Sequence, residues 1–303
     1  MAKKDQKYYP VERNLLFANP SGTGMRIVEV NKGLSAQNRR LYRQNKVYTV
    51  KVDATGVTNQ MFDVYRLRNT FMLQRGYQLA MEEWEKSFAE AKSVVKESAV
   101  GRWRDFRVEL IPTVGDTKCI PVTLTSMGQY PRTATSQVDE WFDSISYESN
   151  GNGRNFGLYS DANTFGIIEE FDKRGHVNEQ PTSPSLNAPY DELNENLSDQ
   201  EFANLQSHGD DPPYDANSST PTSVLEYVGT IVIDSNGSLD KRSTGYFEAP
   251  LGAVFISGSA GHVESIRDAS DVNVKTQLYK VTVQSGDYKG VKAHDYVDVP
   301  NKE

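Results

Sequence analysis

Alternating hydrophobic and polar residues predict most of the strands of this chain. Between Val47 and Asp53, β-branched and aromatic side chains recur at every second position, and the same pattern returns at Leu225–Ile233. Successive side chains of a strand point to opposite faces, so this period predicts strands with one face on a core. Eight strands are predicted in this way, at 47–53, 61–67, 103–110, 119–125, 165–171, 225–233, 246–256 and 277–283.

A second pattern predicts one long amphipathic helix. From Leu73 to Ala99 the hydrophobic residues step by three and four positions, and Glu and Lys occupy the opposite face. Gly101 follows as a plausible end of that helix. Shorter helices are predicted at 136–144 and 198–205.

The order of these elements predicts the fold class. Strands do not alternate regularly with helices, which argues against a parallel α/β sheet. We expect a mainly β protein: an antiparallel, eight-stranded jelly-roll sandwich with a long helix after the second strand and long loop insertions. The predicted organisation is an N-terminal arm (1–46), a jelly-roll domain (47–286) that contains an acidic loop insertion (172–221), and a C-terminal tail (287–303).

Charge is distributed unevenly along the chain. Between Arg174 and Lys241 there are twelve Asp and Glu and no Lys or Arg, whereas the first fifty residues hold ten Lys and Arg against three acids. The formal net charge of -8 argues against a protein dedicated to nucleic-acid binding, but it leaves room for a local contact.

These features together resemble the jelly-roll major capsid proteins of small icosahedral viruses. The resemblance is carried by the strand order from Val47 to Val283, the helix Leu73–Ala99, the acidic loop Asp172–Pro221 and the segment Tyr246–Gly252. It implies two facing four-stranded sheets and a subunit that self-assembles with its own copies into a shell around the genome. It also implies a virion location after synthesis in the host cytoplasm or nucleus. The basic residues of the first 46 positions are too few and too dispersed to condense a large genome alone.

The densest basic stretch is the candidate contact site. It comprises Arg39, Arg40, Tyr42, Arg43 and Lys46. Arginine beside an aromatic ring suits phosphate contact and base stacking. That interpretation makes the genome the partner. A second interpretation is a contact with a neighbouring copy or another virion protein, and a third is an ordinary solvated surface.

No catalytic or metal-binding constellation is predicted. The four histidines are scattered, and Asp210, Asp211 and Asp215 fit a solvated acidic loop better than a calcium site. Glu169 and Glu170 fall in a predicted strand, where they would point to opposite faces. Cys119, the single cysteine, is expected to be buried. We therefore expect no enzyme activity and no cofactor; no apolar run is long enough to span a membrane.

Two other classes of function compete with a shell-forming subunit. A carbohydrate- or receptor-binding β-sandwich of the phage-fibre type could use the sixteen Tyr and three Trp as stacking platforms. Such sandwiches seldom carry a helix as long as the one predicted at 73–99. An enzyme of the cupin type would need clustered His and Glu ligands, which the scattered histidines do not provide.

Overall fold

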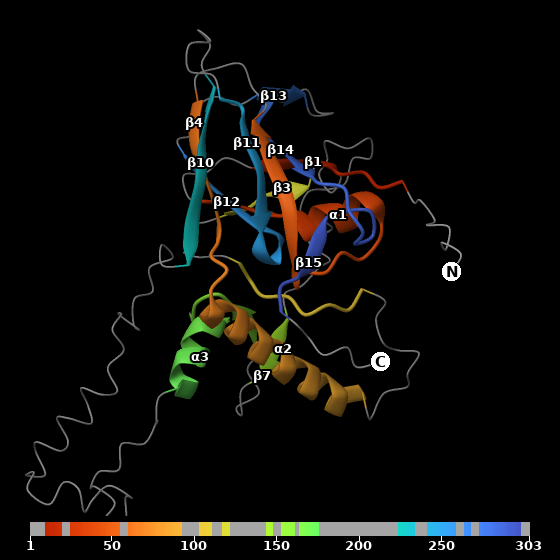
Figure 1. Ribbon diagram of the computed structural model, residues 1–303, viewed down its shortest axis with the longest axis vertical. Helices are drawn as coiled ribbons and strands as arrows, with labels where there is room; N and C mark the ends of the chain where they lie inside the picture. The colour runs from red at the N-terminus through yellow and green to blue at the C-terminus, as the bar shows by residue number, and fades with distance from the viewer. Residues whose placement is uncertain are drawn as a thin grey trace, which may run out of the picture.

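The computed structural model describes twelve segments of the chain, and the fold is mainly β. The described residues are 10–19, 25–54, 60–92, 103–110, 117–121, 144–147, 153–160, 164–175, 224–233, 241–258, 264–267 and 273–297. Two sheets form the body, and the helices α2 and α3, at 71–92 and 167–175, lie with a small third sheet beyond one end of the long strands (Figure 1).

The first sheet has seven strands and is antiparallel throughout. Its main path is β11 (Ser243–Ala249), β3 (Lys46–Ala54), β14 (Asn273–Val283), β1 (Asn14–Asn19) and β6 (Ile120–Pro121). Two short strands lie off this path: β13 (Glu264–Arg267) pairs with β14, and β15 (Ala293–Asp295) pairs with β3.

The second sheet has five strands. Its order is β10 (Leu225–Ile233), β4 (Gln60–Leu67), β12 (Ala253–Gly258), β2 (Arg26–Glu29) and β5 (Thr117–Lys118). The pair β2–β5 is parallel and the other pairs are antiparallel. Strands that follow one another in the chain repeatedly sit in different sheets at the same place in the order: β1 and β2, β3 and β4, β10 and β11, and β12 and β14.

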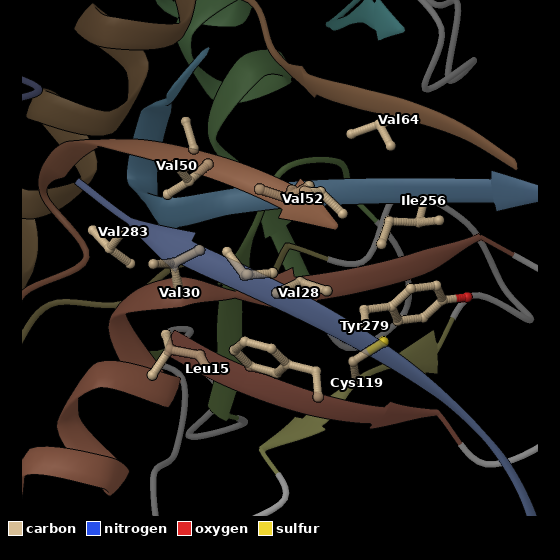
Figure 2. Close-up of a cluster of buried hydrophobic side chains, with 14 of the residues drawn as sticks. Leu15, Val28, Val30, Val50, Val52, Val64, Cys119, Ile256, Tyr279 and Val283 are labelled. Carbon is tan, nitrogen blue, oxygen red and sulfur yellow. The ribbon is translucent and has the colours of Figure 1, made fainter. Parts of the chain in front are cut away.

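The main hydrophobic core fills the space between the two sheets. Val50 and Val52 of the first sheet and Phe62 and Val64 of the second are buried in this cluster. Figure 2 shows side chains from several strands of both sheets pointing toward one another. On the outer face of β3, Lys51 forms an ion pair with Asp53. The alternation that predicted these strands is therefore the alternation between core and surface.

A second core lies where the helices meet the end of the sandwich. It joins side chains of α2 (Phe71–Lys92) and α3 (Ile167–Gly175) to the start of β3, to the 250–255 segment and to the extended chain at 106–110. The third sheet, β7 (Ile145–Tyr147), β8 (Gly153–Gly157) and β9 (Thr164–Gly166), adds Phe156 to it. Gly76 permits close helix contact, because a Cβ there would lie 2.7 Å from the carbonyl oxygen of Ile167.

Four predicted strands differ from the structure, and three of them are shorter than predicted or join neither large sheet. The prediction at 165–171 is wrong beyond Gly166, where α3 begins; Ile167 and Ile168 are buried in the second core on that helix. A short apolar run suits either element, and contact with α2 decides for the helix. The 103–110 segment is extended but joins neither large sheet, and of the predicted strand 119–125 only 120–121 forms one within the described residues.

The predicted strand 246–256 is two strands in different sheets. β11 ends at Ala249, a short 3₁₀ turn η5 (Pro250–Gly252) follows, and β12 continues in the other sheet. Leu251 has a φ of 56° in this turn, which reverses the chain between the sheets. The predicted interruption at Pro250 is thus a complete change of sheet.

The structure places much of residues 1–46, predicted as an arm, inside the sandwich. β1 lies between β14 and β6, β2 lies between β12 and β5, and α1 (Val30–Asn38) packs on the main core. Phe17 is completely buried. The apolar runs of β1 and β2 are short and lie among polar residues, so the sequence alone does not indicate that neighbouring strands pair with them and bury them.

Some predictions fall on parts of the chain that the structure does not describe. The long helix begins at Phe71 and is described as far as Lys92, so residues 93–99 lie outside. The helix predicted at 198–205, most of the acidic insertion and all of the helix predicted at 136–144 except Ser144, which is not helical, also lie outside the described residues. In the predicted tail, β15 pairs with β3, and Tyr296 is buried in the second core.

Candidate functional site

The predicted basic stretch joins α1 to β3. Arg39 ends α1 in the left-handed conformation with a φ of 48°, and Arg40 follows it; both are exposed. Lys46 begins β3. The stretch therefore turns the chain from a helix packed on the core into the middle of the first sheet.

Tyr42 points inward rather than to the surface. Its side chain is fully buried, and its hydroxyl donates a hydrogen bond of 2.9 Å to the carbonyl oxygen of Lys289. Its ring meets that of Tyr288 edge to face at 6.1 Å. Burial raises the pKa of Tyr42. The ring is not available for stacking on a nucleic-acid base.

Arg43 is held by a buried carboxylate. Its guanidinium lies 3.3 Å from Asp105, whose side chain is 3% exposed. The other carboxylate oxygen of Asp105 accepts a 3.0 Å hydrogen bond from the backbone N–H of Gln44. Burial raises the pKa of Asp105, and the Gln44 hydrogen bond and Arg43 oppose that rise. The carboxylate thus ties the basic stretch to the 103–110 segment.

Gln44 makes the same connection through a pair of hydrogen bonds. Its side-chain amide donates to the carbonyl oxygen of Val108 at 3.0 Å, and the N–H of Val108 donates to its side-chain oxygen at 2.7 Å. Two backbone groups of an extended segment are satisfied by one side chain. Backbone hydrogen bonds of Arg107 and Glu109 with Ser144, Phe156 and Leu158 hold the other side of 103–110 to the third sheet, so the segment is fixed without joining either large sheet.

Lys46 is also paired. Its ammonium contacts Asp295 of β15 and lies 4.7 Å from the centre of the Tyr288 ring. Its side chain is only 13% exposed, so most of it is covered.

Lys289 completes the cluster, and sequence reasoning missed it. It lies in a tight turn in which Tyr288 and Val291 exchange two backbone hydrogen bonds of 3.0 Å. Its φ is 52°, and its ammonium donates to the carbonyl oxygen of Leu41. Burial, followed by the charges of Arg40 and Arg43, lowers the pKa of Lys289. No local signal connects this turn to residues nearly 250 positions away.

Together these residues form a surface with excess positive charge, here called the basic corner. It consists of Arg39, Arg40, Arg43, Lys46 and Lys289. Two carboxylates are paired with it, Asp105 and Asp295, so five positive charges less two negative ones leave three. Arg39 and Arg40 have no carboxylate partner among the described residues.

A separate apolar groove lies between the helices. It has a volume of about 320 Å³ and is lined by Gly76, Leu79, Ala80, Phe156, Phe165, Ile167 and Phe171, with Glu83 and Glu170 also in the lining. Three phenylalanine rings give the groove apolar walls, and its charged side chains are the two carboxylates, both of them negative.

The structure also shows where the other residues considered for catalysis or metal binding lie. Glu169 and Glu170 lie in the first turn of α3, not in a strand, and Glu169 accepts a hydrogen bond from the N–H of Ser160. Cys119 is buried with its thiol unpaired. Within the described segments, no group of three or more His, Cys, Asp or Glu could hold a metal ion. None of the helices described there is both long and apolar enough to cross a membrane.

Comparisons with known proteins return no similarity: no family model, no curated protein and no solved structure matches this chain.

Proposed function

We propose that this chain is a structural subunit of a viral capsid, with a jelly-roll body that self-assembles into an icosahedral shell around the genome. Such a subunit functions by burying part of its surface against other copies of the same chain. Strand order is the observation that carries this proposal.

In a jelly roll, one sheet contains the first, eighth, third and sixth strands in that order, and the other contains the second, seventh, fourth and fifth. Taking the strands of this chain as β1, β2, β3, β4, β10, β11, β12 and β14, the first sheet contains β1-β14-β3-β11 and the second contains β2-β12-β4-β10. Every neighbouring pair among these eight is antiparallel. This agreement supports the jelly roll.

The insertion into this body also supports the proposal. Residues 68–224 separate the fourth strand from the fifth and contain α2, α3 and the third sheet. The described parts of this insertion, α2, α3 and the third sheet, lie beyond one end of the sandwich (Figure 1). Capsid subunits of this architecture place large insertions at the sheet ends, where they contact neighbours without disturbing the core.

Exposed apolar side chains provide surface for such contacts. Tyr246 on β11 is 54% exposed and Tyr227 on β10 is 56% exposed, and these two strands form the same edge of the two sheets. Phe71, at the start of α2, is 76% exposed. Apolar groups gathered at sheet edges are surfaces through which copies associate.

Electron microscopy of the purified chain, together with sedimentation velocity across a salt series, tests the proposal. We expect closed particles, with assembly favoured as salt screens the repulsion between chains of net charge -8. A species of one chain at every salt and protein concentration would contradict it. A small oligomer that binds glycans on an array would instead support a carbohydrate-binding sandwich.

A further inference from the structure

We propose that the basic corner binds the acidic run of a second copy of this chain, where the acidic run is residues 176–223. That run contains nine Asp and Glu and no Lys or Arg. The inference rests on the proposed function, because it assigns the corner a partner within an assembly of copies.

The corner has positive charge that its own surroundings do not neutralise. Arg43 and Lys46 already have carboxylate partners, but Arg39 and Arg40 are exposed and unpaired within the described residues. The ammonium of Lys289 donates to a carbonyl oxygen and forms no ion pair within the described residues, although the nearby Asp105 offsets part of its charge. Several cations held close together favour an anionic partner, because each ion pair formed also relieves repulsion among them.

Several hydrogen bonds hold the backbone of Arg43 and the turn that carries Lys289 in place before binding. The hydroxyl of Tyr48 donates to the carbonyl oxygen of Arg43 at 2.6 Å, and the N–H of Arg43 donates to the hydroxyl of Tyr288 at 3.3 Å. Lys289 is fixed by its own turn and by the carbonyl oxygen of Leu41. The backbone that carries these cations therefore needs little ordering on binding, and the ordering cost is limited to the exposed side chains of Arg39 and Arg40.

An acidic polypeptide suits the corner better than nucleic acid does. Binding of single strands usually combines cations with exposed rings on which bases stack. Here the ring of Tyr42 is buried, and the ring of Tyr288 is covered by Tyr42, Lys46 and Lys289. What the corner offers is guanidinium and ammonium groups, and carboxylates pair with these directly.

Stoichiometry also favours a second copy. Every chain has one basic corner and one acidic run, so each copy can bind a neighbour and be bound by another. A contact of this kind is heterologous and closes into a ring when the rotation between copies permits. Closed rings of subunits are the units from which shells are built.

Carbodiimide cross-linking of mixed chains tests the inference. Unlabelled and nitrogen-15-labelled chains are assembled together, and the reagent then joins lysine amines to carboxylates already in contact. Trypsin releases the acidic run within one peptide, residues 175–241, because no Lys or Arg interrupts it. We expect that peptide to be linked to Lys289 or Lys46, with labelled and unlabelled partners combined in the proportions of the mixture. If the two peptides of every cross-link carry the same isotope, the contact forms within one chain and the inference is wrong. The absence of any such cross-link would also overturn it.

A pair of charge-matched variants gives a second readout. Arg40→Glu reverses an exposed cation of the corner, and Lys86→Glu makes the same change on the exposed face of α2. The probe is a synthetic peptide of residues 189–216, which contains eight of the nine carboxylates. We expect the peptide to bind the full chain about three- to tenfold more weakly in Arg40→Glu and equally well in Lys86→Glu. Equal loss in both variants would show non-specific attraction and contradict the inference.

A single-stranded oligonucleotide serves as the competing probe in the same titration. If the corner binds it in preference to the peptide, the partner is nucleic acid and the inference is wrong. The outcomes also separate the inference from the proposed function. If the chain forms particles without the cross-link, the capsid proposal is supported and the contact between the basic corner and the acidic run is wrong. If it forms cross-linked small oligomers but no particles, that contact is supported and the capsid proposal is wrong.

Discussion

Phe62 and Tyr279 meet edge to face between the two sheets, with ring centroids 5.9 Å apart and planes at 80°. Phe62 belongs to β4 of the second sheet, and Tyr279 belongs to β14 of the first. Both side chains are almost completely buried. The contact joins strands that are far apart in the chain, so it forms only when both sheets are in place.

Truncating this ring should destabilise the whole sandwich. We expect Phe62→Ala to lower the free energy of unfolding by about 3–5 kcal/mol, because the lost ring leaves a cavity between the sheets. Met61→Ala, at a neighbouring side chain that is 62% exposed, is the control and should change it by about 0.5 kcal/mol or less. Urea denaturation followed by fluorescence measures both. Similar losses at the two positions would contradict the assigned faces of β4.

Asp105 should give the protein a recognisable pH dependence. Its folded pKa is raised above the ordinary value of 3.8 by burial, so the folded chain holds this proton more tightly than the unfolded chain does. The resulting stabilisation is fully present below the unfolded pKa of 3.8 and is lost as the pH rises through the higher pKa of the folded chain. Since Asp105→Asn cannot titrate, the stability of the native chain relative to this variant should fall as pH rises over that window.

The measurement for Asp105 is the free energy of unfolding of both proteins from pH 4 to pH 7. Other titrating groups are common to the two chains and cancel in the difference. At neutral pH the variant still loses the ion pair with Arg43, at a cost of about 1–3 kcal/mol. A difference that stays constant with pH, or that rises with pH, would show that burial does not dominate the pKa of this carboxyl.

Two glycines with left-handed backbones offer a matched comparison. Gly245 has a φ of 76° and open space where a Cβ would lie, whereas Gly252 has a φ of 66° and a Cβ there would be 3.2 Å from the Tyr48 ring. We expect Gly245→Ala to cost about 1 kcal/mol through backbone strain alone. Gly252→Ala should cost about 2 kcal/mol or more, because the added methyl group also crowds the turn between β11 and β12. Equal melting temperatures for the two variants would be incompatible with this packing.

Cys119 should be unreactive in the folded chain. Burial raises the pKa of its thiol to about 12, so almost no thiolate is present at neutral pH. Figure 2 shows the sulfur within the core beside Tyr279. We expect a thiol reagent such as Ellman's reagent to modify it only as fast as the chain opens, and at once in denaturant. Rapid modification of the native protein would place this thiol at the surface.

Strands and helices with a long, regular hydrophobic pattern can be recognised from the amino-acid sequence without the structure. The strands around 47–53, 61–67, 225–233 and 277–283 and the helix beginning near Leu73 were predicted near their observed positions. Burial on one face imposes a local period of two in a strand and 3.6 in a helix, so no distant contact is needed to recognise them. The mainly β class follows from the same regularity.

Short apolar runs were decided by tertiary contacts. Ile167 and Ile168 suit a strand or a helix equally well in isolation, and only packing against α2 selects the helix. Phe17 lies in a short apolar run within an otherwise polar N-terminal region that suggests an arm, yet β14 and β6 on either side bring β1 into a sheet.

The basic corner shows the same division between local and distant information. Its positive charge could be predicted from Arg39, Arg40 and Arg43, which are close together in the chain. The burial of Tyr42 and the position of Lys289 beside it could not be predicted, because both depend on which strands become neighbours. Local periodicity reports which face of an element is buried. The partner against which it is buried is selected by the free energy of the complete sandwich, to which residues from every part of the chain contribute.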